Sequence, residues 1–378
     1  MAWGLYIHVP FCIRKCPYCD FYSISDLSRQ AEYEAALVAE MAMRARDDAV
    51  FDTVYLGGGT PSVLGPSAVQ RILDAARDYF SILPDAEITL EANPGTVTQE
   101  SFAAYRSAGV NRLNIGVQSF NDANLAFLGR IHTANQAVAA LQAAGRAGFE
   151  NIGLDLIYGL PQQNKGAWHK DLSAAAAFSP SHISCYMLTF EPGTKMTADK
   201  DAGRFVVPPE ERVSAMFVQA AKFLSGRGYQ HYEISNFAAG KSARSRHNLK
   251  YWQNRPYLGL GPAAHSYIAP ERFWNCRSVD TYISEISSGR TPTAETERLT
   301  DSQMMIEALY LGLRQTEGID IPGFETRFGE DFQEMFGPAA APFVESGQMV
   351  LDGQCCRFTR NGMLLLDTIA AALSEMME

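Results

Sequence analysis

Short runs of strand-forming residues alternate with amphipathic stretches along the first half of the chain. Leu5–Val9 alternates between apolar and more polar side chains and predicts a strand. In Glu32–Arg46, charged residues separate the apolar side chains, which predicts a helix. Further strands are expected at Thr53–Leu56, Glu87–Glu91, Arg112–Val117, Ile152–Ile157 and His182–Leu188, and further helices from Pro66 and over Glu100–Ser107, Asn135–Ala147 and Ala167–Phe178. Gly109 and Gly148 stand where helices should end.

Strands that alternate with helices over short connections form parallel sheets with right-handed crossovers. Six such units predict an α/β fold, a partial (β/α)6 barrel related to the TIM barrel. In such barrels the functional site lies at the carboxyl ends of the strands. We therefore expect a barrel domain over residues 1–235 and a linker or motif region over 236–295.

The regular alternation of strands and helices is not continued in the second half of the chain. Pro209–Arg227 predicts a long amphipathic helix and Gly240–Pro262 an irregular functional loop. Helices are then expected over Ser302–Arg314, Phe324–Phe328, Asp331–Glu345 and Leu364–Met376, with a hairpin turning at Asp352-Gly353. This order resembles a small α+β winged helix over 296–378. Because the segment is acidic, we interpret it as a lid or interaction module rather than a DNA-binding domain.

Charge and composition narrow the classes of function. The 378 residues carry a formal net charge of −10, which argues against a nucleic-acid partner. Neither a signal peptide nor an apolar run long enough for a transmembrane segment is recognisable. We expect a cytoplasmic protein, with peripheral membrane contact left open.

Three cysteines, Cys12, Cys16 and Cys19, lie within eight residues after the first predicted strand. A structural zinc site requires four ligands, and no fourth Cys or His follows closely. A 4Fe–4S cluster bound by three cysteines keeps one iron open for another ligand. A reducing compartment suits such a site, since oxidised thiols could not hold iron.

The spacing Cys-x-x-x-Cys-x-x-Cys, with Tyr18 before the last cysteine, resembles the radical S-adenosylmethionine (SAM) enzymes. The resemblance implies that Cys12, Cys16 and Cys19 hold a 4Fe–4S cluster whose open iron binds SAM. Gly57-Gly58-Gly59-Thr60 at the second strand end is either a tight turn or a backbone cradle for SAM. Asp155, a charge within an apolar strand, requires a partner.

Four segments narrow the resemblance to the oxygen-independent coproporphyrinogen III oxidase branch of that family. They are Leu5–Cys12, Gly57–Pro61, Gly116–Phe120 and Asp155–Pro161. By residue-by-residue correspondence, the resemblance implies SAM contacts at Tyr6, Tyr18, Gly58, Gly59, Thr60, Glu91, Gln118, Arg130, Asp155 and, more weakly, Met187.

Two departures from the oxidases favour the heme-chaperone members of this branch. Phe21 stands where the oxidases have a further cysteine, and the first strand begins without their preceding extension. The segment His247-Asn248-Leu249-Lys250-Tyr251-Trp252 also matches the His-Asn-x-x-Tyr-Trp motif of the chaperones. The expected function is heme binding and transfer to acceptors, with respiratory proteins among the candidates. The alternatives are oxidative decarboxylation of coproporphyrinogen III and, less favoured, methyl transfer; enzymatic activity is left open.

The same resemblance places heme at the motif. We expect His247 to contact the iron, Asn248 to orient its ring, and Tyr251 and Trp252 to supply flat apolar surface. The nearby basic residues Arg244, Arg246, Lys250 and Arg255 are candidate partners for the heme propionates. His265 and a cysteine are rival iron ligands.

Overall fold

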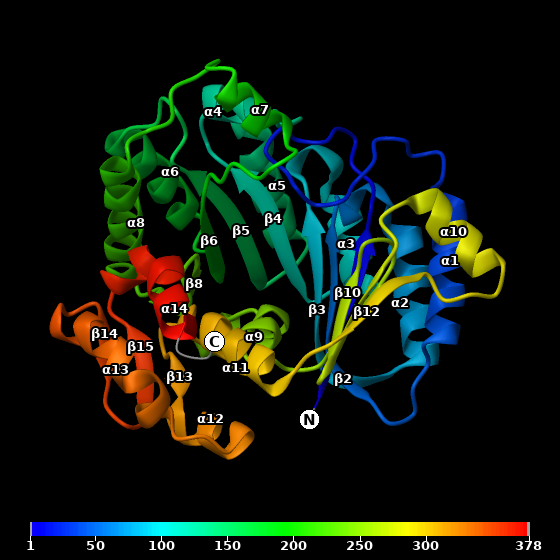
Figure 1. Cartoon of the computed structure of the whole chain (residues 1–378). Coiled ribbons are helices and arrows are strands. Elements are labelled where there is room, and N and C mark those ends of the chain that lie inside the picture. Colours follow the sequence, from blue (N-terminus) through cyan, green and yellow to red (C-terminus); the bar gives the residue numbers. More distant parts are fainter. Residues whose placement is uncertain (1, 376–378) are drawn as a thin grey trace.

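A sheet of parallel strands forms the centre of the molecule. The computed structural model describes residues 2–375, and within them twelve strands form one sheet in the order β12-β11-β10-β9-β1-β2-β3-β4-β5-β6-β8-β7. The six consecutive strands from β1 to β6 are parallel, as predicted (Figure 1). They are β1 (Trp3–Val9), β2 (Val50–Gly58), β3 (Ser81–Ala92), β4 (Arg112–Gln118), β5 (Asn151–Tyr158) and β6 (His182–Met187).

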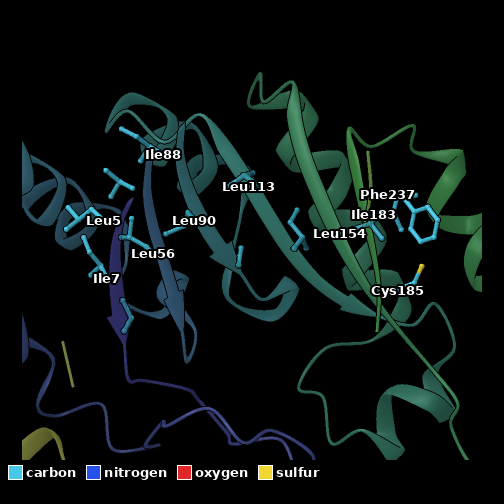
Figure 2. Packing of buried hydrophobic residues seen from close by; sticks show 14 of the residues in the cluster. Leu5, Ile7, Leu56, Ile88, Leu90, Leu113, Leu154, Ile183, Cys185 and Phe237 are labelled. Atoms are coloured by element: carbon cyan, nitrogen blue, oxygen red, sulfur yellow. The ribbon is translucent and has the colours of Figure 1, made fainter. Parts of the chain in front are cut away.

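Helices cover the outer face of these strands. They are α1 (Gln30–Met43), α2 (Pro66–Tyr79), α3 (Gln99–Ser107), α5 (Ala134–Arg146), α6 (Lys165–Ala177) and α8 (Glu210–Ser225). The short helices α4 (Asp122–Phe127) and α7 (Lys195–Asp201) lie at the carboxyl end of the barrel (Figure 1). Leu5, Leu56, Leu113 and other alternate residues of the strands are fully buried beneath them (Figure 2). The remaining positions of each strand face the barrel interior, because successive side chains of a strand point to opposite faces. The site is therefore built from inward-facing residues.

Local signals explain where several of the helices begin and end. Thr98 and Thr133 form capping boxes at the starts of α3 and α5. Gly109 and Gly148 follow these helices with φ of 103° and 85°, a left-handed conformation that glycine adopts without strain. The helix ends predicted at these two glycines are confirmed.

The irregular loop predicted for Gly240–Pro262 is wrong, because this stretch contains a helix and a strand. Ser245 caps α9 (Arg246–Trp252), and β9 (Tyr257–Leu260) pairs in parallel with β1. Around them the sheet is extended by β7 (Gln230–His231), β8 (Asn236–Ala238), β10 (His265–Ile268), β11 (Glu271–Asn275) and β12 (Thr293–Arg298), and α10 (Val279–Ser287) lies between β11 and β12. The region expected as a linker thus contributes several strands to the barrel sheet.

A buried carboxylate joins this extension to the first helix. Glu40 of α1 is fully buried and accepts hydrogen bonds from the Tyr282 hydroxyl, the Gly261 amide and the Asn275 side chain at 2.7–2.8 Å. Arg44 completes the charge pairing at 2.9 Å from Glu40. The carboxylate thereby links α1, the end of β9, β11 and α10.

The carboxyl-terminal part forms a small separate α+β domain. It contains α11 (Asp301–Leu313), β13 (Ile319–Asp320), α12 (Ile321–Phe328), α13 (Phe332–Glu345), the β14 (Met349–Leu351) and β15 (Cys355–Phe358) hairpin, and α14 (Leu366–Ser374). Its three strands pair in the order β13-β15-β14. The predicted final helix is present, although its predicted end at Met376 lies outside the described residues. No helix within residues 2–375 combines the length and apolar character needed to cross a membrane.

Candidate functional site

A cavity of about 890 Å³ occupies the interior of the barrel. At the carboxyl ends of the strands it is lined by Cys19, Gly58, Glu91 and Gln118, and at the opposite end by Arg112 and His182. The start of α14 and the residues before it close one side, between Met363 and Thr368. The small domain therefore contributes directly to the wall of the barrel cavity.

The cysteine loop lies over the carboxyl end of this cavity. Its backbone is fixed by hydrogen bonds from Cys12 N to Ile24 O at 2.9 Å and from Met196 N to Pro17 O at 2.8 Å. Arg14 donates to the Gly129 and Arg130 carbonyls at 2.8 Å, which ties the loop to the segment after β4. These contacts hold Cys12, Cys16 and Cys19 in one ordered segment.

The three cysteines carry free thiols and fit the donor set of an iron–sulfur cluster. Burial, together with the neighbouring Cys16 and Cys12, raises the pKa of Cys19 to about 11, so the thiols interact electrostatically. No three His, Cys, Asp or Glu side chains among residues 2–375 already surround a single metal position. In a 4Fe–4S cluster each cysteine would bind a different iron, and binding would require the thiols to lose their protons.

The glycines after β2 serve the cysteine loop as well as the cavity. A methyl group at Gly59 would lie 2.7 Å from the carbonyl oxygens of Val9 and Phe11, and one at Gly58 would lie 2.5 Å from the His8 ring. The amide of Gly59 also donates to Val9 O at 2.8 Å. A side chain at Gly59 would therefore displace the backbone that leads into Cys12.

Two carboxylates face the cavity from neighbouring parts of the sheet. The Tyr55 hydroxyl donates to Glu91 at 2.7 Å, and the Asn114 amide donates to Asp155 at 2.7 Å. Burial raises the pKa of Glu91 to about 7 and that of Asp155 to about 6. Asn114 is the partner that the charge at Asp155 requires.

Gln118 and Arg130 lie near the cysteine loop. Gln118 has a φ of 67°, which is uncommon for a residue with a side chain and is found at sites where the surroundings impose it. Arg130 donates to Gly116 O at 2.9 Å and approaches Cys16 Sγ and the Tyr18 hydroxyl at 3.5 Å. A positive charge thus stands beside the predicted cluster position.

Unsatisfied polar atoms concentrate in this cavity. Within the described residues, eleven buried side-chain nitrogen or oxygen atoms lack a hydrogen-bond partner, and five belong to residues that line the cavity. These residues are Thr89, Gln118, Arg130, Asp155 and His182. Because buried polar groups are nearly always paired, such a concentration indicates a polar ligand.

Most of the other predicted SAM contacts line the cavity, and one does not. Tyr18, Gly58, Thr60 and Met187 line the cavity, with Met187 half exposed. Tyr6 does not line the cavity, and its hydroxyl forms a hydrogen bond with His8 Nδ1 at 3.1 Å. Tyr55, Thr89 and His182 line the cavity although the sequence analysis did not single them out.

The His-Asn-x-x-Tyr-Trp motif lies on α9 and helps to form the floor of the barrel. His247 is 1% exposed, its Nδ1 is 2.8 Å from Thr53 Oγ1, and its Nε2 is 2.8 Å from the Tyr251 hydroxyl. Its ring stacks on Tyr55 with centroids 5.1 Å apart. Burial lowers the pKa of His247 to about 3, so the ring is neutral. Contact with iron would require at least one of these hydrogen bonds to break.

The remaining motif residues and their basic neighbours are also engaged. Asn248 lines the cavity, whereas Trp252 packs against Tyr232. Arg244 pairs with Glu317 at 2.8 Å, and Arg246 and Lys250 pair with Asp52 at 3.3 and 2.6 Å. The rival ligand His265 is exposed and stacks on Trp274, outside the cavity lining.

The raised pKa of Glu91 predicts how stability depends on pH. The folded protein keeps this proton up to about pH 7, whereas an unfolded chain loses it near 4.5. Between these values the folded state binds more protons, so stability falls as pH rises. Relative to Glu91→Gln, the wild type should lose on the order of 1–3 kcal/mol of unfolding free energy between pH 5 and pH 8. Urea unfolding of both proteins at several pH values measures this difference; parallel curves would contradict it.

Comparison with known proteins agrees with this geometry. Residues 6–175 match the family model of the radical SAM superfamily, and residues 299–365 match that of the HemN C-terminal domain. The solved structure of the coproporphyrinogen III oxidase HemN from Escherichia coli superposes with a TM-score of 0.86. It covers 99% of this chain and 90% of its own at 24% sequence identity, a likeness of fold. The fold and site thus define a radical SAM protein with a HemN-type carboxyl-terminal domain.

The similarity to curated relatives is more specific. The heme chaperone HemW of Synechocystis is 39% identical over 328 residues, covering 84% of this chain and 79% of that protein. The heme chaperone HemW of Bacillus subtilis is 34% identical and covers 97% of this chain and 98% of its own. The chain belongs to the HemW family of radical SAM proteins.

Proposed function

We propose that this protein binds heme and transfers it to acceptor proteins, and that it carries a 4Fe–4S cluster and SAM. The observation that carries the proposal is the match over nearly the whole chain to relatives that are named heme chaperones. The cavity supports it, since it combines an apolar wall with unsatisfied polar atoms. Phe21, which is 64% exposed, occupies the position where the oxidases carry a further cysteine.

Cys12, Cys16 and Cys19 would hold the cluster at the carboxyl end of the barrel. A bound cluster would supply the electron for reductive cleavage of SAM. Glu91, held by Tyr55, would accept hydrogen bonds from the ribose of SAM. Gln118 and Asp155 offer unsatisfied oxygens, and Arg130 places a positive charge beside Cys16.

The function is tested by titrating the purified protein with hemin and mixing the complex with a heme-free acceptor protein. Heme should move to the acceptor, which the acceptor's own absorption spectrum reports. A protein that does not bind hemin, or that never releases it, would refute the proposal. An anaerobic assay with SAM, a reductant and coproporphyrinogen III tests the alternative, since formation of protoporphyrinogen would identify an oxidase.

The SAM site is tested separately with Glu91→Ala. Loss of the carboxyl group should weaken SAM binding by about 1–3 kcal/mol, because a hydrogen-bond acceptor disappears from a buried site. Isothermal titration calorimetry of the reconstituted protein measures this change. Glu317→Ala, which removes a carboxylate remote from the cavity lining, is the control and should bind as the wild type does. Equal SAM affinity in both variants would remove Glu91 from the site.

A further inference from the structure

We propose that heme lies along β6 in the barrel cavity, with its ring between the end of β6 and the start of α14 and one carboxylate at His182, at the opposite end of the cavity from the cysteine loop. This inference rests on the proposed heme-binding function and specifies where the ligand lies. The site is distinct from the motif histidine, which is buried with both ring nitrogens engaged.

The first argument is an apolar wall on two facing elements. Tyr186 and Met187 at the end of β6 are 39% and 50% exposed, and Leu364 and Leu365 before α14 are each 39% exposed. All four line the same cavity. Tyr186 and Met187 belong to the barrel, whereas Leu364 and Leu365 belong to the small domain. Figure 1 shows α14 beside the β6 and β8 end of the sheet. Large, partly exposed apolar side chains from two elements that line one cavity fit a flat apolar ligand.

The second argument is a buried ring nitrogen of His182, a residue outside the predicted SAM contacts, that has no hydrogen-bond partner. His182 is 2% exposed, its Nε2 is 2.8 Å from the Tyr232 hydroxyl, and its Nδ1 has no partner. Burial and the charge of Arg112 lower its pKa, so the ring is neutral. When Tyr232 donates to Nε2, Nδ1 carries the ring proton and offers a donor to a ligand. A macrocycle cannot reach so buried a nitrogen, whereas a carboxylate on a flexible arm can.

The charges around the floor suit a ligand that is apolar with acidic arms. Arg112 is 2% exposed, donates to Ala243 O at 3.0 Å and lies 3.7 Å from the buried Glu87, and Arg314 lines the cavity from the end of α11. Arg314 is held by the fully buried Glu233 at 3.3 Å. Heme combines a flat apolar ring with two carboxylates, so the ring matches the wall while its two acidic arms can reach His182 and Arg314.

The test is hemin titration of the full-length protein, followed at the Soret band. Leu365→Asp should weaken hemin binding about ten-fold or more, because a charge would be buried against the ring. Val344→Asp makes the same change at a residue of similar exposure, 36%, on α13 of the same domain and outside the cavity, and should bind as the wild type does. Circular dichroism should show both variants folded.

The carboxylate contact is tested from the ligand side, with the unaltered protein. The dimethyl ester of heme should bind about ten-fold or more weakly than hemin, since an ester cannot accept as a carboxylate does. Equal affinity for the two ligands would overturn the carboxylate contact at His182. Unchanged binding in Leu365→Asp, together with loss in His247→Ala, would move the ligand to the motif and leave heme binding itself intact. A wild-type protein that binds no hemin would refute the proposed function along with this site.

Discussion

Cys16→Ser should lose most of its iron and sulfide, falling from about four iron atoms per chain to less than one. A serine hydroxyl is a poor substitute for a thiolate at iron, and the remaining pair, Cys12 and Cys19, cannot hold a cluster that already leaves one iron open. The loop itself should persist, because its fixed contacts involve the backbone and Arg14 rather than the Cys16 thiol. Iron and sulfide analysis with visible absorption after anaerobic reconstitution measures the loss.

The matched control is Cys276→Ser. Cys276 is partly buried on the segment between β11 and α10, far along the chain from the cysteine loop, and should not be needed for iron. A cluster content that falls equally in both variants would indicate general sensitivity to cysteine loss. Full iron content in Cys16→Ser would contradict the assignment of the three ligands.

Gly59→Val should destabilise the fold and abolish both cluster and SAM binding. A side chain at Gly59 would lie 2.7 Å from two carbonyl oxygens, those of Val9 and Phe11, and backbone cannot move aside as a flexible side chain can. The cost should be about 2–3 kcal/mol of unfolding free energy, as for other overpacked sites. Because Phe11 directly precedes Cys12, the displacement reaches the first cluster ligand.

Gly145→Val is the control for this prediction. Gly145 lies near the end of α5, and a methyl group there would meet nothing within 4 Å. Its unfolding free energy should stay within about 0.5 kcal/mol of the wild type. Urea unfolding measures the unfolding free energy of both variants, and iron analysis measures their cluster content. A Gly59→Val protein that keeps its cluster and loses only SAM would show that the glycine serves the ligand alone.

The sequence predicts the barrel well because its signals are local. The strands from β1 to β6 are rich in apolar residues and each is followed by a helix, and α3, α4, α5 and α6 begin at side-chain caps. The strands from residue 236 onward are short, and α9 has only seven residues, so neither shows a clear period. Their structure depends on pairing with β1 and β6, far away in sequence.

The candidate site is predicted where its residues follow from local strand patterns. Glu91 and Gln118 stand at strand ends, where a barrel places its site, and Asp155 is a charged residue within the apolar strand β5. Thr89 lies two residues before Glu91, so the alternation along β3 could have identified it as inward-facing. No such pattern reveals that His247 would be enclosed, since its partner Thr53 lies 194 residues earlier.

The burial of Glu40 determines which part of the chain unfolds as one unit. A truncation after residue 235 would remove the groups from Gly261, Asn275 and Tyr282 that satisfy this carboxylate, and also the Ala243 carbonyl that receives Arg112. Two buried charged side chains, one on α1 and one in the barrel, would then lose partners. We therefore expect the strands up to β12 and the six central strands to unfold as one cooperative unit, with their amides exchanging with solvent deuterium through a shared opening event.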